Sequence, residues 1–146
     1  MFEIRNIGWW YWLATLVLLA GGLAGWPSGI DLATALCAVQ VVHFAIRTGS
    51  PTSFPVQVRA AYLDLLVAGN WPPLAFVHWV QLAGTSATVV FGYCPLARML
   101  SLLPWNRREP FTVNLVRRVF LSRPVRGSIV EQLAAQQLVM AERMAA

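Results

Sequence analysis

Four apolar stretches, separated by short turns rich in glycine, proline and polar residues, occupy the first two thirds of the chain. They cover residues 7–26, 30–46, 55–69 and 73–93. Such stretches approach the roughly 20 apolar residues that a helix needs to cross the hydrocarbon core of a bilayer. The pattern predicts an all-α integral membrane protein, with four short transmembrane helices in a domain over residues 1–104.

The first stretch has the end markers of a membrane helix. Three tryptophans lie within residues 9–12, and Trp26 stands at the other end. Indole rings favour the headgroup level, so this distribution is typical of aromatic belts at both interfaces. Gly21 and Gly25 form a GxxxG pair, which lets another helix approach closely.

The third stretch, residues 55–69, is the hardest to assign. Its 15 residues span roughly 22 Å as a helix, less than a hydrocarbon core about 30 Å thick. Asp64 costs about 3 kcal/mol at depth, which offsets the roughly 0.3–0.6 kcal/mol that each apolar side chain contributes. An alternative is therefore three transmembrane helices plus a re-entrant or interfacial helix.

The positions of the basic residues favour four spans. All eleven are arginines, and most lie beyond the last apolar stretch. With four spans, both termini are cytoplasmic and every arginine lies on or near the cytoplasmic face, as the positive-inside rule requires. With three spans, Arg5, Arg47 and Arg59 would be external. We therefore expect a multi-pass protein of a bacterial-type cytoplasmic (inner) membrane, with its C-terminus in the cytoplasm.

Composition agrees with a membrane location. Hydrophobic residues make up 58% of the chain and charged residues only 12%, with a mean hydropathy of +0.58. Soluble domains carry about 25% charged residues. The net charge of +5 is concentrated next to the membrane stretches, so it does not predict nucleic-acid binding.

Residues 105–146 form a basic cytoplasmic tail. Residues 111–122 and 128–144 have the spacing of amphipathic helices, the first suited to lie on a membrane surface. Arg98, just before the tail, is expected to reach the lipid headgroups. Six further arginines are candidate contacts for anionic lipids or for a partner protein: Arg107, Arg108, Arg117, Arg118, Arg123 and Arg126.

Two sets of residues on the fourth stretch are typical of a contact between helices or subunits rather than of a lipid-facing surface. One is a polar stripe with helical spacing, formed by His78, Gln81, Thr85 and Thr88. The other is a seam of small residues, formed by Gly84, Thr88 and Gly92.

Two more polar residues lie deep in the apolar stretches. Gln40 in the second stretch needs a hydrogen-bond partner. Asp64 in the third is costly at membrane depth, and such carboxylates are usually paired. Arg59 lies about 140° around the helix from Asp64, so a partner on another helix or another subunit is expected.

The sequence has no motif of a known catalytic centre. It contains no HExxH, Walker loop or GxGxxG, no Ser/His/Asp arrangement is evident, and Cys37 and Cys94 lack metal-binding spacing. We therefore expect neither an enzyme nor a metal site. His43 and His78 are candidates for binding a haem or a chlorophyll-type pigment. They share one depth only in the three-span alternative.

These observations favour a non-catalytic accessory or structural subunit of a larger inner-membrane complex, plausibly a bioenergetic one. Its partners would be other membrane subunits, in a hetero- or homo-oligomer, and anionic lipids. Two alternatives stay open. One is a membrane protein that binds haem or chlorophyll through His43 or His78, and the other is a small oligomeric transporter or channel built around Asp64 and the polar stripe.

Overall fold

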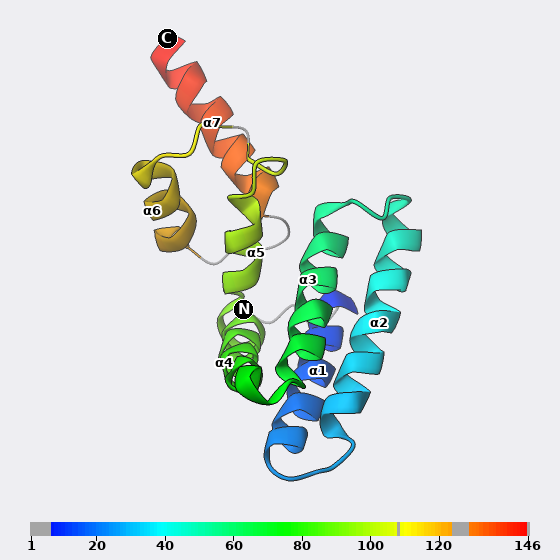
Figure 1. Cartoon of the computed structure of the whole chain (residues 1–146). Helices are drawn as coiled ribbons and strands as arrows, with labels where there is room; N and C mark the ends of the chain where they lie inside the picture. Colours follow the sequence, from blue (N-terminus) through cyan, green and yellow to red (C-terminus); the bar gives the residue numbers. More distant parts are fainter. Residues whose placement is uncertain (1–6, 108, 124–128, 146) are drawn as a thin grey trace.

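The computed structural model describes residues 7–107, 109–123 and 129–145, and this part of the chain is helical with no strand. Figure 1 shows the arrangement. The elements in chain order are α1 (Ile7–Leu23), α2 (Gly29–Thr48), α3 (Phe54–Gly69), the short 3₁₀ helix η1 (Pro72–Leu74), α4 (Phe76–Phe91), α5 (Pro95–Ser101), α6 (Val113–Leu121) and α7 (Ile129–Ala145).

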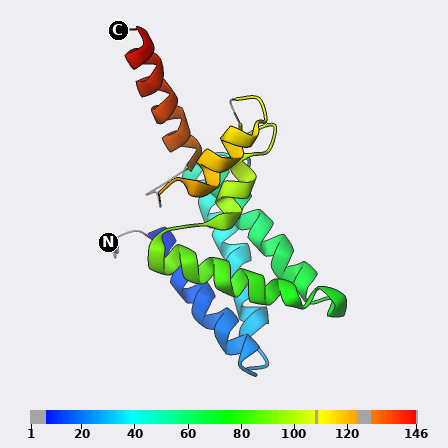
Figure 2. The same ribbon diagram turned by 90° about the vertical axis from the view of Figure 1, so that its left-hand side faces the viewer.

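Helices α1 to α4 form an up-down-up-down bundle. Helix α1 packs against α2 and α4, and α3 packs against the same two helices, which closes a ring. The start of α1 meets the end of α4, where Trp9 Nε1 donates a hydrogen bond to the carbonyl oxygen of Val89 over 3.1 Å. Figure 2 shows α4 crossing obliquely over α1. The bundle therefore has two ends, one with the 24–28 and 70–75 turns and one with the 49–53 turn.

Proline and glycine set the helix boundaries. Pro55 lies in the first turn of α3, where its missing N–H costs nothing. Gly49 and Gly92 end α2 and α4 in the left-handed conformation, with φ of 67° and 70°, which glycine adopts without strain. The predicted fourth helix, residues 73–93, is consequently divided into η1 and α4. Helix α4 is shorter than predicted because it starts at Phe76 and Gly92 ends it.

Two helical segments are long and apolar enough to cross a membrane among the residues that the structure describes. They are Gly29–Thr48 and Pro72–Phe91, the second including η1. Only 22% of each is buried, so neither resembles the covered core helix of a soluble protein. The apolar helix α1 has 17 residues and α3 has 16, and both fall below that length.

The closest approach of α1 and α2 is at Gly22 and Gly29. A Cβ atom on Gly29 would lie 2.4 Å from the backbone nitrogen of Gly22, so the two backbones touch. The expected role of the Gly21 and Gly25 pair was wrong. Gly21 lies against the Trp26 ring, and Gly25 sits in the turn with φ of 110° and open space around it.

Arg98 holds the start of the tail against the bundle. Its guanidinium donates hydrogen bonds to the Val119 carbonyl oxygen, to Ser122 Oγ over 2.7 Å and to the Arg123 carbonyl oxygen over 3.0 Å. It also lies 4.1 Å above the ring of Tyr93. With 2% of its surface exposed, Arg98 does not reach the headgroups as expected; it binds the C-terminal carbonyls of α6, where a cation is favourable.

Candidate functional site

The polar stripe of α4 lies inside the bundle and bonds to α3. Gln81 Nε2 donates to the Tyr62 carbonyl oxygen over 3.0 Å, and Thr85 Oγ1 donates to the Gln81 carbonyl oxygen over 2.6 Å. The Thr85 hydrogen is thereby used, so Tyr62 Oη donates in its 2.7 Å bond to Thr85 Oγ1. All three side chains are buried. The stripe is therefore a contact within the chain.

His78 continues this contact toward the end of α3. Its ring packs directly on Gly69, where a Cβ atom would lie 2.6 Å from His78 Cε1. Nδ1 lies 3.4 Å from Gln81 Oε1, and in this contact the imidazole N–H donates. Only 3% of His78 is exposed. The α3 backbone thus covers the ring and leaves no space for a tetrapyrrole on that side.

The predicted small-residue seam serves three separate purposes. Gly84 faces Pro95, whose Cγ and Cδ would lie 3.9 Å from an added Cβ. Thr88 Oγ1 donates to the Gly84 carbonyl oxygen over 2.9 Å. Gly92 ends α4. These positions fit the joint between α4 and α5 rather than a continuous docking surface.

Gln40 finds its partner on α1. Its Nε2 donates to Thr15 Oγ1 over 3.0 Å, and Thr15 Oγ1 donates to the Tyr11 carbonyl oxygen over 2.8 Å. Gln40 and Thr15 are completely buried. The predicted helix contact of Gln40 is thus made inside the chain.

Arg59 is buried among aromatic rings near the end of the bundle that has the 49–53 turn. Its guanidinium carbon lies 3.5 Å from the centre of the Phe44 ring and 5.5 Å from that of Trp12. Nη1 donates to the Pro55 carbonyl oxygen over 3.0 Å. Ring faces stabilise a cation in this position, and no carboxylate pairs with Arg59 among the described residues.

The two histidines are not brought together. His43 is in the last two turns of α2, where Tyr11 Oη is hydrogen-bonded to His43 Nδ1 over 3.2 Å. His78 is in the first turn of α4. Since α3 spans the bundle between these points, the histidines lie at opposite ends and cannot hold one shared metal. Residues 7–107, 109–123 and 129–145 contain no group of three or more histidine, cysteine, aspartate or glutamate side chains that could hold a metal ion.

The outward surface of the bundle is strongly apolar. Large hydrophobic side chains that are at least half exposed occur on all four helices. Examples are Val17, Val39, Val42, Ile46, Val67, Phe76, Trp79, Val80, Val90 and Phe91. The interior is mixed, because an apolar core that includes Leu19, Cys37 and Leu66 is joined by buried polar side chains. The buried polar side chains include Thr15, Gln40, Gln81 and Thr85. Apolar side chains exposed in such number on one bundle are unusual for the surface of a soluble protein.

Asp64 is the exception on this outward surface. It lies on the exposed side of α3, next to Val67 one turn away. Within the described ranges it forms no ion pair, and its carboxylate accepts no hydrogen bond. Arg59, the nearest cation along the helix, points inward to Phe44.

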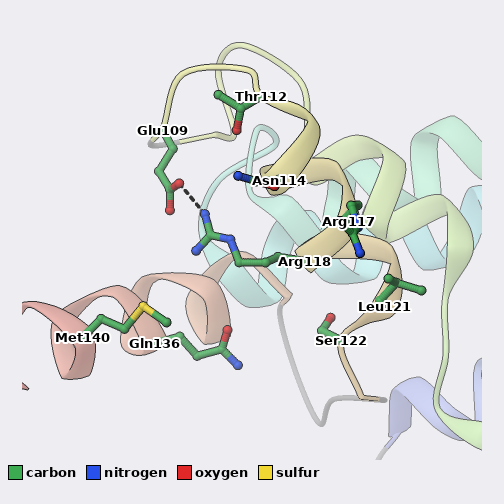
Figure 3. Close-up of a pocket in the computed structure, with 9 residues that line it drawn as sticks. All are labelled: Glu109, Thr112, Asn114, Arg117, Arg118, Leu121, Ser122, Gln136 and Met140. Carbon is green, nitrogen blue, oxygen red and sulfur yellow. Dashed lines mark hydrogen bonds and ion pairs between the residues drawn. The ribbon is translucent and has the colours of Figure 1, made fainter.

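A basic groove separates α6 from α7 (Figure 3). Its volume is about 820 Å³, and Arg117, Arg118, Thr112, Gln136 and Met140 are among the residues that line it. Arg118 pairs with Glu109 at 2.5 Å, whereas Arg117 is exposed. The groove therefore has the exposed guanidinium of Arg117 beside the hydroxyl group of Thr112 and the apolar side chain of Met140.

The other predicted arginine contacts are dispersed. Arg107 lies 5.6 Å from the centre of the Phe111 ring, and the Arg123 backbone receives a bond from Arg98. Arg108 and Arg126 lie outside the described residues. Of the four candidates that the structure describes, Arg117 and Arg118 share the groove.

Sequence reasoning missed the structural roles of Tyr62, Arg59 and Arg98. Tyr62 and Arg59 lie on the same side of α3, three residues apart, which is a signal that both belong to one buried face. For Arg98 the signal is weaker, because an arginine after a membrane stretch is ordinarily a headgroup contact.

Comparisons with protein-family models, curated proteins and solved structures found no match to this chain.

Proposed function

We propose that the chain is a four-span protein of a bacterial-type cytoplasmic membrane and a non-catalytic accessory subunit of a larger complex. The observation that carries this proposal is the outward surface of the bundle, where each helix has a large apolar side chain that is at least half exposed, while several polar side chains are buried inside. Such a surface is stable in hydrocarbon and costly in water. All four helices carry such exposed apolar side chains, including the short α1 with Val17 and the short α3 with Val67.

The charges support one orientation of the bundle. Arg47 and Arg59 lie toward the end that also holds α5 and α6, while the 24–28 and 70–75 turns contain no arginine. The positive-inside rule therefore puts the C-terminal tail in the cytoplasm. Short α3 crosses with the help of its neighbours, since Tyr62 is hydrogen-bonded to α4 and Arg59 lies against aromatic rings of α1 and α2.

The assignment as an accessory subunit rests on what the outward surface presents. The hydrogen bonds of Gln81 and Thr85 in the polar stripe are made within the chain, which supports a packing role for these side chains. Asp64 is an outward carboxylate without a partner among the described residues. A charge of this kind is expensive in the bilayer and favours assembly with another membrane protein.

Purification of the tagged full chain from its own membranes in a mild detergent tests this function. We expect the protein to stay in the membrane pellet after alkaline carbonate washing and to co-purify with other membrane polypeptides in a fixed ratio. Release by carbonate would contradict the membrane assignment. A monomer that co-purifies with no other polypeptide would contradict the role as a subunit.

The basic groove supports anionic lipids as a second kind of partner. Arg117 is exposed beside Thr112 and Asn114, and the exposed apolar residues of α6 include Val113 and Leu121. Guanidinium groups bind phosphate well, and apolar neighbours suit the interface. The groove thus fits a phospholipid headgroup at the inner surface.

A further inference from the structure

We propose that the outward face of α3 docks a transmembrane helix of a different subunit, and that this helix carries an arginine or lysine opposite Asp64. The inference deepens the proposed function and rests on it. It starts from the position of Asp64, which is exposed on α3 with apolar neighbours and has no partner among the residues that the structure describes.

The depth of Asp64 makes an unpaired carboxylate costly. Asp64 lies five residues before Gly69, the last residue of α3, which is roughly 7–8 Å along the helix axis. Beyond that end, Trp71 and Trp26 are 65% and 47% exposed, as expected of indoles at the headgroup level. Aspartate has one methylene and does not reach the interface as arginine and lysine do. A cation on the docked helix compensates this charge.

The chain itself does not supply that cation. Arg59 is 7% exposed and stacks on Phe44. Arg47 is exposed, but it ends α2 at the opposite end of the bundle. His78 is buried against Gly69. A second copy of the described chain therefore presents no exposed positive group at the level of Asp64, which is why we infer a different subunit.

The surroundings of Asp64 fit a helix rather than a soluble ligand. Val67 is 58% exposed on the next turn, and Ala60, one turn before, adds a small side chain on the same side of α3. Small and apolar residues around one charged group are typical of helix contacts in membranes. The charge pair then fixes how far the docked helix is shifted along α3. Any other shift would leave Asp64 unpaired or place it next to a like charge, and both are costly.

Site-specific photocrosslinking tests the docking. A photoreactive amino acid at Val67 of the full chain is activated in intact membranes of the source organism, and the crosslinked peptide is sequenced. We expect a peptide from a membrane helix with arginine or lysine within one turn of the crosslink. The matched control at Val42, an exposed apolar residue of α2, should not yield that peptide. Crosslinks to lipid alone, to a second copy, or to a helix without a cation would overturn the inference.

Charge substitution tests the pairing independently. Asp64→Asn keeps the size and removes the charge, and we expect at least tenfold less partner to co-purify. Asp64→Glu should retain most of it. Asp31→Asn, an exposed carboxylate in the first turn of α2, serves as the control and should change nothing. The purified Asp64→Asn variant should melt as the parent chain does, because the side chain is outward.

The two proposals fail in different ways. If the parent chain co-purifies with a membrane partner and Asp64→Asn does so equally well, the ionic docking is wrong while the role as a subunit stands. If the parent chain has no partner at all, both are wrong.

Discussion

At the scale of single residues, Gly69 shows how closely α3 and α4 approach. The His78 ring occupies the space that a side chain at position 69 would need. The contact between backbone and imidazole also keeps His78 Nδ1 near Gln81. Because Gly69 has no side chain, the His78 ring can pack on the α3 backbone, and this contact positions the start of α4.

We expect Gly69→Ala to lower the free energy of unfolding in detergent by about 1–3 kcal/mol, as overpacking does. Gly84→Ala is the matched control, because its added Cβ would make only an ordinary 3.9 Å contact with Pro95. The control should be neutral or slightly stabilising. Thermal melting or denaturation in mixed micelles measures both.

His78→Ala provides the second half of this experiment. Removing the ring removes the obstacle, so Gly69→Ala should cost much less in the His78→Ala background than in the parent chain. Equal costs in the two backgrounds would show that the clash with His78 does not limit the approach of the helices.

At the scale of elements, the sequence predicted the helices of the bundle more accurately than their contacts. Pro55, Gly49 and Gly92 set boundaries through backbone conformation, which is a local property and can be read from the sequence. The predicted 30–46 and 55–69 segments accordingly lie within two residues of α2 and α3 at each end.

Contacts could not be predicted in the same way, because they depend on how helices rotate about their axes. The polar stripe on α4 is equally suited to α3 or to another subunit until the partner face is known. Arg98 illustrates the same limit. Its flexible side chain reaches either the headgroups or the end of α6, and the position of α6 decides between them.

The Arg98 contacts predict that this side chain is the main polar link between α5 and α6, beside the hydrogen bond that Tyr93 Oη donates to the Phe120 carbonyl oxygen over 3.0 Å. Arg98→Leu would leave the Val119 and Arg123 carbonyls without their charged donor. Such a loss costs about 2–3 kcal/mol, so amide exchange in α6 should become roughly 30- to 150-fold faster.

Hydrogen–deuterium exchange in detergent measures this effect. Arg117→Leu, on the exposed side of the same helix, should leave the exchange rates of α6 unchanged. Unchanged rates in Arg98→Leu as well would mean that apolar packing of Leu115 and Val119, together with the Tyr93 hydrogen bond, holds α6 without Arg98.

The groove between α6 and α7 predicts a preference among lipids. Arg117→Gln removes one guanidinium, worth roughly 1 kcal/mol near an anionic surface, and should weaken binding of anionic phospholipid about fivefold. Native mass spectrometry of the detergent-purified protein measures lipid retention. Arg143→Gln, at the exposed far end of α7, should have no effect, and equal loss in both variants would exclude a specific role of the groove.

At the scale of the whole molecule, the disputed third helix decides the topology. In the proposed four-span arrangement, the 24–28 and 70–75 turns lie outside, and the 49–53 turn and the tail lie in the cytoplasm. A cysteine in place of Ser28 or Asn70 should react with a membrane-impermeant maleimide on intact cells. One in place of Ser50 should react only after the membrane is opened.

The background for this labelling is a chain with Cys37→Ala and Cys94→Ala, since both native thiols are free. Labelling of Ser50→Cys on intact cells, with no labelling of Ser28→Cys, would instead support three spans. The amino terminus would then be outside.

The shortness of α3 also affects the lipid around it. Its 16 residues span about 24 Å, whereas the 20 residues of α2 span about 30 Å. In the four-span arrangement the bilayer must thin beside α3 and return to its full thickness beside α2. A neighbouring helix of matching short length would relieve this deformation, so elastic stress in the lipid itself would draw a partner toward the same side of the bundle.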